Sequence, residues 1–287
     1  MEPVTRIEAA LAAALALATG PGCPPGLAAA VRHAVFPGGS RLRPRLCLAV
    51  ARACGDRQPA VTDAAAAALE LLHCASLIHD DLPCFDDAPT RRGRPSVHRA
   101  FGQPLAVLAG DALIVLAFET LARAAGGASL SLLLLTVARS VGMPAGIAAG
   151  QAWESEPDAE LVSYQRAKTG ALFAGATMAG AAATGNDPSD WSTLGERLGE
   201  AYQVVDDIRD VAANPSELGK PAGRDLALGR PNAARQLGLE GALARLDRLV
   251  AEAEAAIPPC PGADELRSLV RRQAHRFLPP GLVPIAA

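Results

Sequence analysis

Two clusters of aspartates, far apart in the sequence, are the side chains best suited to carry chemistry in this 287-residue chain. The first cluster lies within residues 79–87, which read HDDLPCFDD, and the second within residues 202–210, which read YQVVDDIRD. In a helix, Asp206 and Asp210 would lie one turn apart on the same face, with Asp207 beside them. Like charges placed so closely repel one another, so we expect cations or water to neutralise each cluster.

The residues around the aspartates bear on two interpretations of these clusters. An acidic run usually forms a solvated face, and this is the simpler interpretation of either cluster taken alone. Both clusters, however, follow apolar residues: Leu77 and Ile78 precede the first, and Val204 and Val205 precede the second. Carboxylates in such surroundings are typical of magnesium sites, where the ion binds one or two carboxylates together with phosphate oxygens. Two clusters facing each other across a helical bundle would therefore hold magnesium ions, and the ions would hold a diphosphate.

Basic residues that could bind a diphosphate lie close to the aspartates in the sequence. Arg91, Arg92 and Gly93 follow the first cluster, Lys220 follows the second, and residues 38–45 read GGSRLRPR. Arginine binds phosphate through two parallel N–H donors, whereas lysine acts as a point charge. Each basic group taken alone is most simply part of an ordinary surface loop. Two aspartate clusters that are each followed by a basic, glycine-containing loop fit phosphate chemistry better.

The composition predicts an all-α protein. Half of the residues are apolar and only 3% are aromatic. Most of the apolar residues are alanine and leucine, which are strong helix formers. The β-branched runs that are typical of strands are scarce. The formal net charge of −3 argues against a nucleic-acid-binding protein, which normally carries a basic excess or patch.

Neither the cysteines nor the N-terminal residues indicate export. No cysteine pair forms a CxxC motif and no His/Cys set has zinc-ligand spacing, so free thiols in a reducing cytosol are expected. The uncharged residues 9–31 follow a poorly basic start, and prolines interrupt them well short of the roughly 20 apolar residues that a membrane span needs. We therefore expect a cytoplasmic protein without a membrane span. The cysteines are Cys23, Cys47, Cys54, Cys74, Cys84 and Cys260.

Helical periodicity recurs along the whole chain and predicts a single domain over residues 1–287, a bundle of about ten helices. Thr62 is the candidate N-cap of the long helix that ends in the first cluster, and Pro144 the early proline of a later one. No segment has a strand period. The predicted helices are Val4–Ala18, Val61–Asp80, Ala106–Arg123, Ser129–Ser140, Pro144–Trp153, Leu161–Thr184, Asp190–Val211, Leu237–Ala256 and Ala263–Phe277.

With these motifs in this order, the chain resembles the all-trans polyprenyl diphosphate synthases, the farnesyl and geranylgeranyl diphosphate synthase family. The resemblance runs from Phe36 to about Gly262 and rests on the Gly-Gly/Arg loop, the DDx4D motif, Arg-Arg-Gly, Lys-Thr, the glutamine before DDxxD, and Gly-Lys. Residues 149–154 (AGQAWE) and 168–173 (KTGALF) are similar to the geranylgeranyl synthases of bacterial carotenoid and bacteriochlorophyll pathways. The resemblance implies the all-α isoprenoid synthase (class I terpenoid synthase) fold.

The resemblance also implies a role for each matching residue. Three magnesium ions would bind the aspartates, and the diphosphate of an allylic substrate (dimethylallyl, geranyl or farnesyl) and that of isopentenyl diphosphate would bind separate basic groups. The metal ligands would be Asp80, Asp81, Asp86, Asp206, Asp207 and Asp210. The allylic diphosphate would contact Arg91, Lys168, Thr169, Gln203, Lys220 and Arg230, and isopentenyl diphosphate would contact Ser40, Arg43, His73 and Arg92. Lys168, Thr169 and Gln203 would also face the allylic cation.

The chemistry expected of such a site is ionisation, condensation and elimination. Positive charge on the departing pyrophosphate lets the carbon–oxygen bond ionise, and an apolar pocket protects the resulting cation from water. The double bond of isopentenyl diphosphate then attacks, and a proton is lost. No nucleophilic serine or cysteine is needed, and His79 is expected to be a buried, hydrogen-bonded structural residue.

One departure from the family pattern concerns the isopentenyl diphosphate site. Ser40 stands where the family usually has lysine, and the loss of one charge-assisted contact would cost on the order of 1.5–3 kcal/mol. Arg41 and Arg45 are the neighbouring residues that could substitute for the missing charge. The other departures are minor: Ala88 and Pro89 stand where further acids often follow the first motif, and Arg230 replaces a lysine with its charge kept.

Product length in this family depends on the side chains just before the first aspartates. Ala75, five residues before Asp80, and Ser76 beside it are small, as in the bacterial geranylgeranyl type, so we expect a twenty-carbon product. A bulky aromatic residue there would stop growth near fifteen carbons. The alternative is that Ala75 is only a small packing residue and that the floor of the tunnel lies at Leu72 or on a neighbouring helix.

Three other functions remain open. They are a farnesyl diphosphate synthase, a terpene cyclase, and a non-catalytic regulatory subunit of another prenyl synthase. The cyclase would need Asn/Asp, Ser/Thr and Glu in its second metal motif, which residues 206–210 lack, and a non-catalytic subunit would have no use for two complete aspartate motifs. A homodimer is expected, with residues 110–113 as the guessed contact.

Overall fold

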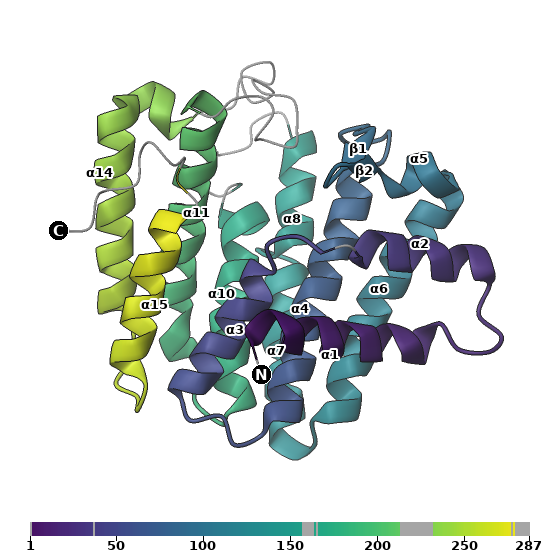
Figure 1. Cartoon of the computed structure of the whole chain (residues 1–287), viewed down its shortest axis with the longest axis horizontal. Helices are drawn as coiled ribbons and strands as arrows, with labels where there is room; N and C mark the ends of the chain where they lie inside the picture. Colours follow the sequence, from purple (N-terminus) through teal and green to yellow (C-terminus); the bar gives the residue numbers. More distant parts are fainter. Residues whose placement is uncertain are drawn as a thin grey trace.

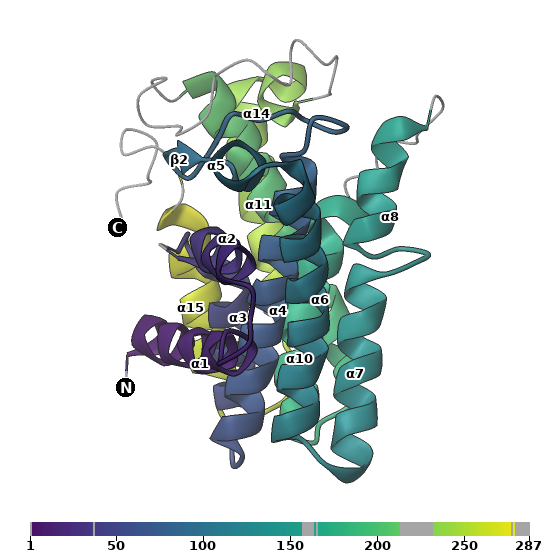
Figure 2. The ribbon, with the colours of Figure 1, turned by 90° about the vertical axis from the view of Figure 1, so that its right-hand side faces the viewer.

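The computed structural model describes residues 2–36, 38–156, 164, 166–212, 232–276 and 278. Within these residues the fold is all-α, as predicted, apart from one two-stranded hairpin. Most of the long helices run roughly parallel to one another, and the first two helices lie across them (Figures 1 and 2). The helices are α1 Pro3–Ala18, α2 Pro25–Val35, α3 Leu42–Ala53, α4 Pro59–Asp80, α5 Val97–Phe101, α6 Gln103–Ala124, α7 Gly127–Val141, α8 Ile147–Ala152, α10 Ala171–Ala183, α11 Ser192–Ala212, α14 Ala233–Ala255 and α15 Ala263–Arg276.

Helix α4 lies at the centre of the bundle and ends in the first aspartate cluster. It packs against α1, α3, α6 and α10, and leucines such as Leu69 and Leu71 are fully buried in these contacts. Its many alanines let the neighbouring helices approach closely, which keeps the apolar interior dense. Position and burial of α4 therefore fix where Asp80 and Asp81 emerge.

Several predicted helix starts differ from the structure, among them that of α14, which begins at Ala233 and not at Leu237. Helix α4 begins at Pro59, and Thr62 is not its cap: the threonine side chain lies inside the first turn, where its hydroxyl donates to Asp56 Oδ1 at 3.0 Å. Helix α8 begins only at Ile147, because the residues from Gly142 to Gly146 form a tight turn in which a side chain on Gly146 would lie 2.4 Å from the backbone of Val141. Pro144 therefore does not mark the start of this helix.

The predicted helix Leu161–Thr184 is interrupted. Residues 161–163 and 165 lie outside the described residues, and a π-helical turn, η2 (Arg166–Gly170), precedes α10. A short 3-10 turn, η1 (Trp153–Ser155), follows α8, and another, η3 (Pro188–Trp191), precedes α11. Helix α14 contains a kink at Gly238, whose φ of 71° is outside the helical range.

A small hairpin that the sequence pattern did not predict positions the two arginines after the first cluster. Strands β1 (Thr90–Arg91) and β2 (Arg94–Pro95) pair antiparallel, with Arg91 opposite Arg94. The turn residues Arg92 and Gly93 both have positive φ, 53° and 74°, which is the geometry of a tight two-residue hairpin turn. The hairpin lies at the same end of the bundle as the C-terminal ends of α4 and α11 (Figure 1).

Two helices, α4 and α6, are long and apolar enough to span a membrane by length and composition. Of the apolar window of α4, 83% is buried inside the bundle, so its hydrophobicity is that of a core helix. The corresponding window of α6 is only 39% buried, and Val107, Leu108 and Val115 are exposed on it. Length and composition alone are weak evidence for a span, and the exposed face of α6 is considered below.

Candidate functional site

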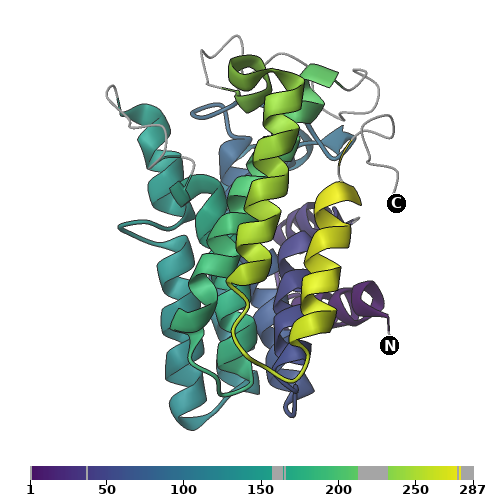
Figure 3. The same cartoon turned by 90° about the vertical axis from the view of Figure 1, so that its left-hand side faces the viewer.

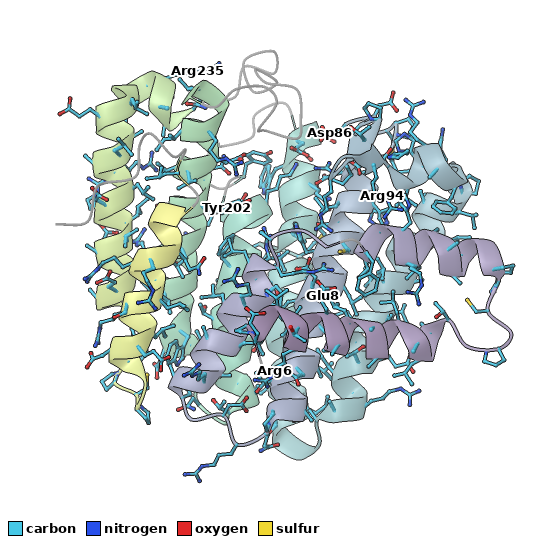
Figure 4. The ribbon with its side chains drawn as sticks, in the orientation of Figure 1. Arg6, Glu8, Asp86, Arg94, Tyr202 and Arg235 are labelled. Atoms are coloured by element: carbon cyan, nitrogen blue, oxygen red, sulfur yellow. The ribbon has the colours of Figure 1, made fainter. Side chains whose placement is uncertain are left out.

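The C-terminal end of α4 forms the first wall of the candidate site. After Asp80 the chain turns back, so that the backbone N–H of Asp86 donates to the Asp80 carbonyl at 2.9 Å. Asp80 is buried, and its Oδ1 accepts a hydrogen bond from Gln151 Nε2 at 2.9 Å. Burial raises the pKa of Asp80 above its ordinary value, against the opposing effect of Lys168. The turn thus brings the two outer aspartates of the DDx4D motif together at the end of the bundle, where Figure 4 labels Asp86.

Asp81, unlike this pair, binds the hairpin. Its carboxylate accepts hydrogen bonds from Arg91 Nε at 3.0 and 3.2 Å and a further bond from Nη2. Burial raises the pKa of Asp81, and the bonded Arg91 opposes that rise. Burial alone would lower the pKa of Arg91, but its bonds to Asp81 outweigh this and raise it. Asp81 and Arg91 therefore act as a fixed pair that fastens the hairpin to α4.

A chain of hydrogen bonds along α11 forms the second wall. The Thr169 hydroxyl donates to Gln203 Oε1 at 3.4 Å, and Gln203 Nε2 donates to Asp207 Oδ1 at 3.0 Å. Asp207 Oδ2 accepts from the backbone N–H of Ala233 at 2.8 Å, and Asn232 Nδ2 donates to the Asp207 carbonyl at 3.1 Å. The buried Asp207 carboxylate therefore joins α11 to the start of α14, while Asp206 beside it is only partly buried.

Lys168, in the π-helical turn, lies between the carboxylates of two other elements. Its Nζ lies 2.6 Å from Glu154 Oε1 and 3.6 Å from Asp80 Oδ1. The Tyr164 hydroxyl donates to the same Glu154 oxygen at 2.6 Å. The Lys-Thr motif is thus placed at the first aspartate cluster by Lys168 and at the second by Thr169.

Arg43, His73 and Arg92 form a positively charged group beside the walls. Arg43 Nη1 lies 3.3 Å from His73 Nε2, and the Arg43 guanidinium stacks over the Phe173 ring at 5.0 Å. Burial lowers the pKa of His73 well below its ordinary value, and the charges of Arg43 and Arg92 lower it further. The buried atoms Arg43 Nε and His73 Nδ1 have no hydrogen-bond partner in the described part of the chain. Buried donors without partners, beside the positive charge of Arg43, suit an anion.

The structure argues against both arginines considered as substitutes for the missing lysine at Ser40. Arg41 is buried and committed to Glu8, Glu70 and the Val35 carbonyl. Arg45 lies on a different face of α3 from Arg43, where it lines a cavity of about 400 Å³ between α3, α11 and α15. Ser40 itself is exposed. Burial and two ion pairs argue against Arg41 in that role, and the position of Arg45 on α3 argues against Arg45.

Several predicted site residues lie outside what the structure describes. Lys220 and Arg230 belong to residues 213–231, which are not described, and the side chain of Asp210 is not described either. Ala75 is buried on α4, and Ser76 is buried beside it with its carbonyl bonded to Gln151 Nε2 at 2.9 Å. Ala75 lines neither the cavity beside Arg45 nor a smaller one beside Arg92, so its role in product length stays a prediction.

His79 has a packing role rather than a catalytic position. It faces α6, where a Cβ atom added to Gly110 would lie 2.1 Å from His79 Nε2, so only glycine fits at that position without a shift of the ring. Its nearest charged partner is Asp111, at 3.8 Å. The side chain is 24% exposed, so it is less deeply buried than expected. All six cysteines are free thiols, as predicted.

The donor chemistry of the two walls fits magnesium. Within the described ranges no group of three or more His, Cys, Asp or Glu side chains is arranged to hold a metal ion unaided. Magnesium in phosphate-processing sites takes one or two carboxylates and completes its shell with water and substrate phosphate oxygens. The pair Asp80 and Asp86, held together by the turn and supplying only hard oxygens, is suited to that kind of site.

The sequence analysis missed three residues that hold the predicted ones. Gln151 binds Asp80, Glu154 binds Lys168, and Asn232 binds the Asp207 carbonyl. Asn232 also caps α14 by accepting from Arg235 N at 3.1 Å, and an asparagine before an alanine-rich helix is a recognisable cap signal. Gln151 and Glu154 lie within residues 149–154, for which the sequence indicated only a similarity to bacterial geranylgeranyl synthases.

Comparison with known proteins agrees with this geometry. A sequence model of the polyprenyl synthetase family matches residues 24–255. The chain is 56% identical to a geranylgeranyl diphosphate synthase of Cereibacter sphaeroides, with 96% of each chain covered, and 50% identical to that of Rhodobacter capsulatus, with 95% of each covered. Its fold matches the Helicobacter pylori geranyltransferase solved with magnesium and isoprenyl diphosphate, at a TM-score of 0.77 and 28% identity over 96% of this chain and 98% of that one.

Proposed function

Because this chain belongs to the polyprenyl synthetase family, whose members are magnesium-dependent and use isopentenyl and allylic diphosphates, we propose that it is a geranylgeranyl diphosphate synthase. The reaction is the head-to-tail condensation of isopentenyl diphosphate with an allylic diphosphate. The observation that carries the proposal is the meeting, at one end of an apolar bundle, of an aspartate pair with a basic group whose buried donors have no partners.

The allylic diphosphate would bind between the two walls. Three magnesium ions per site are proposed, held by Asp80 and Asp86 on one side and by Asp206 with Asp210 on the other; they would supply positive charge to the departing pyrophosphate. Asp81 and Asp207 would support their neighbouring aspartates, because each is committed to another element. Arg91, Lys168, Lys220 and Arg230 would provide the protein's own cations.

Isopentenyl diphosphate would bind the group of Arg43, His73 and Arg92. The orphaned donors Arg43 Nε and His73 Nδ1 would gain partners there, which recovers the free energy lost by burying them unpaired. The exposed Ser40 hydroxyl at the edge offers only a neutral contact. The site therefore relies on three residues where a lysine would have added a fourth.

Thr169 and Gln203 would stabilise the allylic cation. Gln203 Nε2 donates to Asp207 and Gln203 Oε1 accepts from the Thr169 hydroxyl, so the oxygens of both side chains keep lone pairs that carry partial negative charge. Such dipoles stabilise positive charge without forming a bond to it. The apolar residues below, among them Ala75 and Leu72, would exclude water and receive the growing chain.

The proposal extends to domain organisation, cellular location and pairing of the chain. The chain would form a single synthase domain over residues 1–287, act in the cytoplasm, and pair with a second copy through α6. The exposed apolar residues Val107, Leu108 and Val115 of α6 support that pairing, since large exposed apolar patches often mark protein interfaces.

The experiment is an incubation of the purified protein with magnesium, isopentenyl diphosphate and, separately, dimethylallyl, geranyl and farnesyl diphosphates, with products identified by mass. A twenty-carbon diphosphate that requires magnesium is the expected result. A fifteen-carbon product would replace the proposal by a farnesyl diphosphate synthase. Absence of condensation with every starter would favour a regulatory subunit.

A further inference from the structure

Two side chains of one short segment each hold one of the residues assigned above to the diphosphate site. Gln151, in α8, donates through Nε2 to Asp80 Oδ1 and to the Ser76 carbonyl, both at 2.9 Å. Glu154, in the η1 turn that follows, accepts a bond from Lys168 Nζ at 2.6 Å. The segment thus fixes both a carboxylate of the first wall and the cation nearest to it.

The Lys168 ammonium lies closer to one of its two neighbouring carboxylates than to the other. It lies 2.6 Å from Glu154 Oε1 but 3.6 Å from Asp80 Oδ1. The side chains of Lys168 and Glu154 are only 20% and 16% exposed, so water screens their attraction weakly. The Tyr164 hydroxyl, bonded to the same Glu154 oxygen, holds the carboxylate in place.

The backbone makes this arrangement rigid. A Cβ atom added to Gly150 would lie 2.3 Å from the backbone nitrogen of Lys168, so α8 and the π-helical turn are in direct backbone contact. π-helical turns frequently occur at functional sites, where they re-aim a side chain. The reach of Glu154 to Lys168 is therefore set by packing and not by a freely moving loop.

We propose that Glu154 is a positioning residue that holds the Lys168 ammonium away from Asp80 and towards the place of the allylic diphosphate; this rests on the function proposed above. Without the negative charge of Glu154, attraction would draw the ammonium across to Asp80 Oδ1. A carboxylate paired with an ammonium is a poorer ligand for a divalent cation, and the ammonium would no longer be available to the diphosphate. Gln151 complements this, because its neutral amide orients Asp80 without cancelling its charge.

The test is a double-mutant cycle on equilibrium binding of inorganic pyrophosphate with magnesium, measured by calorimetry in the absence of turnover. E154Q is expected to weaken binding about tenfold, comparable to losing one hydrogen bond to a charged group. Because Glu154 acts through Lys168, E154Q in a K168Q background should cause no further loss. E154D, which keeps the charge, should restore most of the affinity. E156Q is the matched control: it removes the same charge from an exposed residue of the same segment and should leave binding unchanged.

Steady-state kinetics provide the second measurement. E154Q should raise the KM for the allylic diphosphate and the magnesium concentration needed for half-maximal activity, with the KM for isopentenyl diphosphate unchanged, whereas a general loss of structure would raise both KM values. Full additivity of the two substitutions, or unchanged pyrophosphate binding in E154Q, would overturn the inference. Failure of the wild-type protein to condense any allylic diphosphate would instead overturn the proposed function, whatever the binding cycle shows.

Discussion

The Asp207 carboxylate lies at the start of α14, where its Oδ2 accepts a hydrogen bond from the backbone N–H of Ala233 at 2.8 Å. Neighbouring aspartates of one motif therefore have different surroundings. Asp207 is 4% exposed and joins two helices, whereas Asp206 is partly exposed at the end of the bundle. A sequence motif treats the two residues alike, but the structure separates an anchoring aspartate from one that can face a ligand.

The first prediction concerns this pair. Replacement of Asp207 by Ala should lower the free energy of unfolding by about 1–3 kcal/mol, because it leaves the Ala233 N–H and the Gln203 amide without an acceptor. Replacement of Asp206 by Asn should leave the unfolding free energy within about 0.5 kcal/mol, the usual range for a substitution outside the core, yet reduce kcat strongly. Urea denaturation and the condensation assay measure the two effects. Equal loss of stability in both variants would contradict the assignment.

The second prediction concerns Ser40. Replacement of Ser40 by Lys should lower the KM for isopentenyl diphosphate about tenfold, because it adds a charge-assisted contact where the exposed hydroxyl now stands. The KM for the allylic substrate should not change. Replacement of Arg45 by Gln is the control, since Arg45 lines a cavity on another face of α3 and its loss should leave this KM unaltered. A weaker response to Ser40 than to Arg45 would show that the arginine does reach the substrate.

The third prediction concerns product length. Replacement of Ala75 by Phe should shift the main product from twenty to about fifteen carbons, if this position floors the tunnel as the family resemblance implies. The substitution should also cost roughly 1–3 kcal/mol of stability, because Ala75 is 1% exposed in a closely packed helix interface. Mass spectrometry of the products gives the answer, with S76A as a control that removes only a hydroxyl. An unchanged twenty-carbon product in a folded variant would move the floor elsewhere.

The fourth prediction concerns pH. Burial lowers the pKa of His73, so the folded protein binds a proton there less readily than the unfolded chain. The contribution of the neutral His73 ring to the free energy of unfolding is fully present above the unfolded-state pKa of about 6.5. This contribution decreases as the pH falls below that value. Replacement of His73 by Asn should reduce the slope of unfolding free energy against pH between 7 and 5. Denaturation of the wild-type protein and the variant at several pH values tests this. Identical slopes would exclude His73 as a source of the pH dependence.

The sequence predicted the all-α fold and the elements that carry both aspartate clusters, because helical periodicity and the apolar flanks of α4 and α11 are local signals. It did not predict the hairpin around Arg92, which depends on a two-residue turn at positive φ rather than on a strand pattern. Nor could it assign Arg41, whose partners come from α1 and α4, or Arg45, whose surroundings depend on the rotation of α3 relative to its neighbours. The partners Gln151 and Glu154 required knowledge of which segments meet α4 and the π-helical turn, and that information is tertiary.

The burial of Arg41 has a consequence for the N-terminal helix. Its guanidinium, 1% exposed, is shared between Glu8 of α1 and Glu70 of α4, and Glu70 also lies 3.7 Å from Arg92. Figure 4 labels Glu8 on α1, where that helix crosses the bundle, and Figure 3 shows the N-terminus at the edge of the bundle. Removing α1 would leave Arg41 with one carboxylate instead of two and would disturb the electrostatic balance of the loop that carries Arg92. The first helix contributes no residue to the site, yet it helps to hold the position of the side proposed to bind isopentenyl diphosphate. A shortened protein that lacks this helix should therefore lose substrate affinity before it loses its helical content.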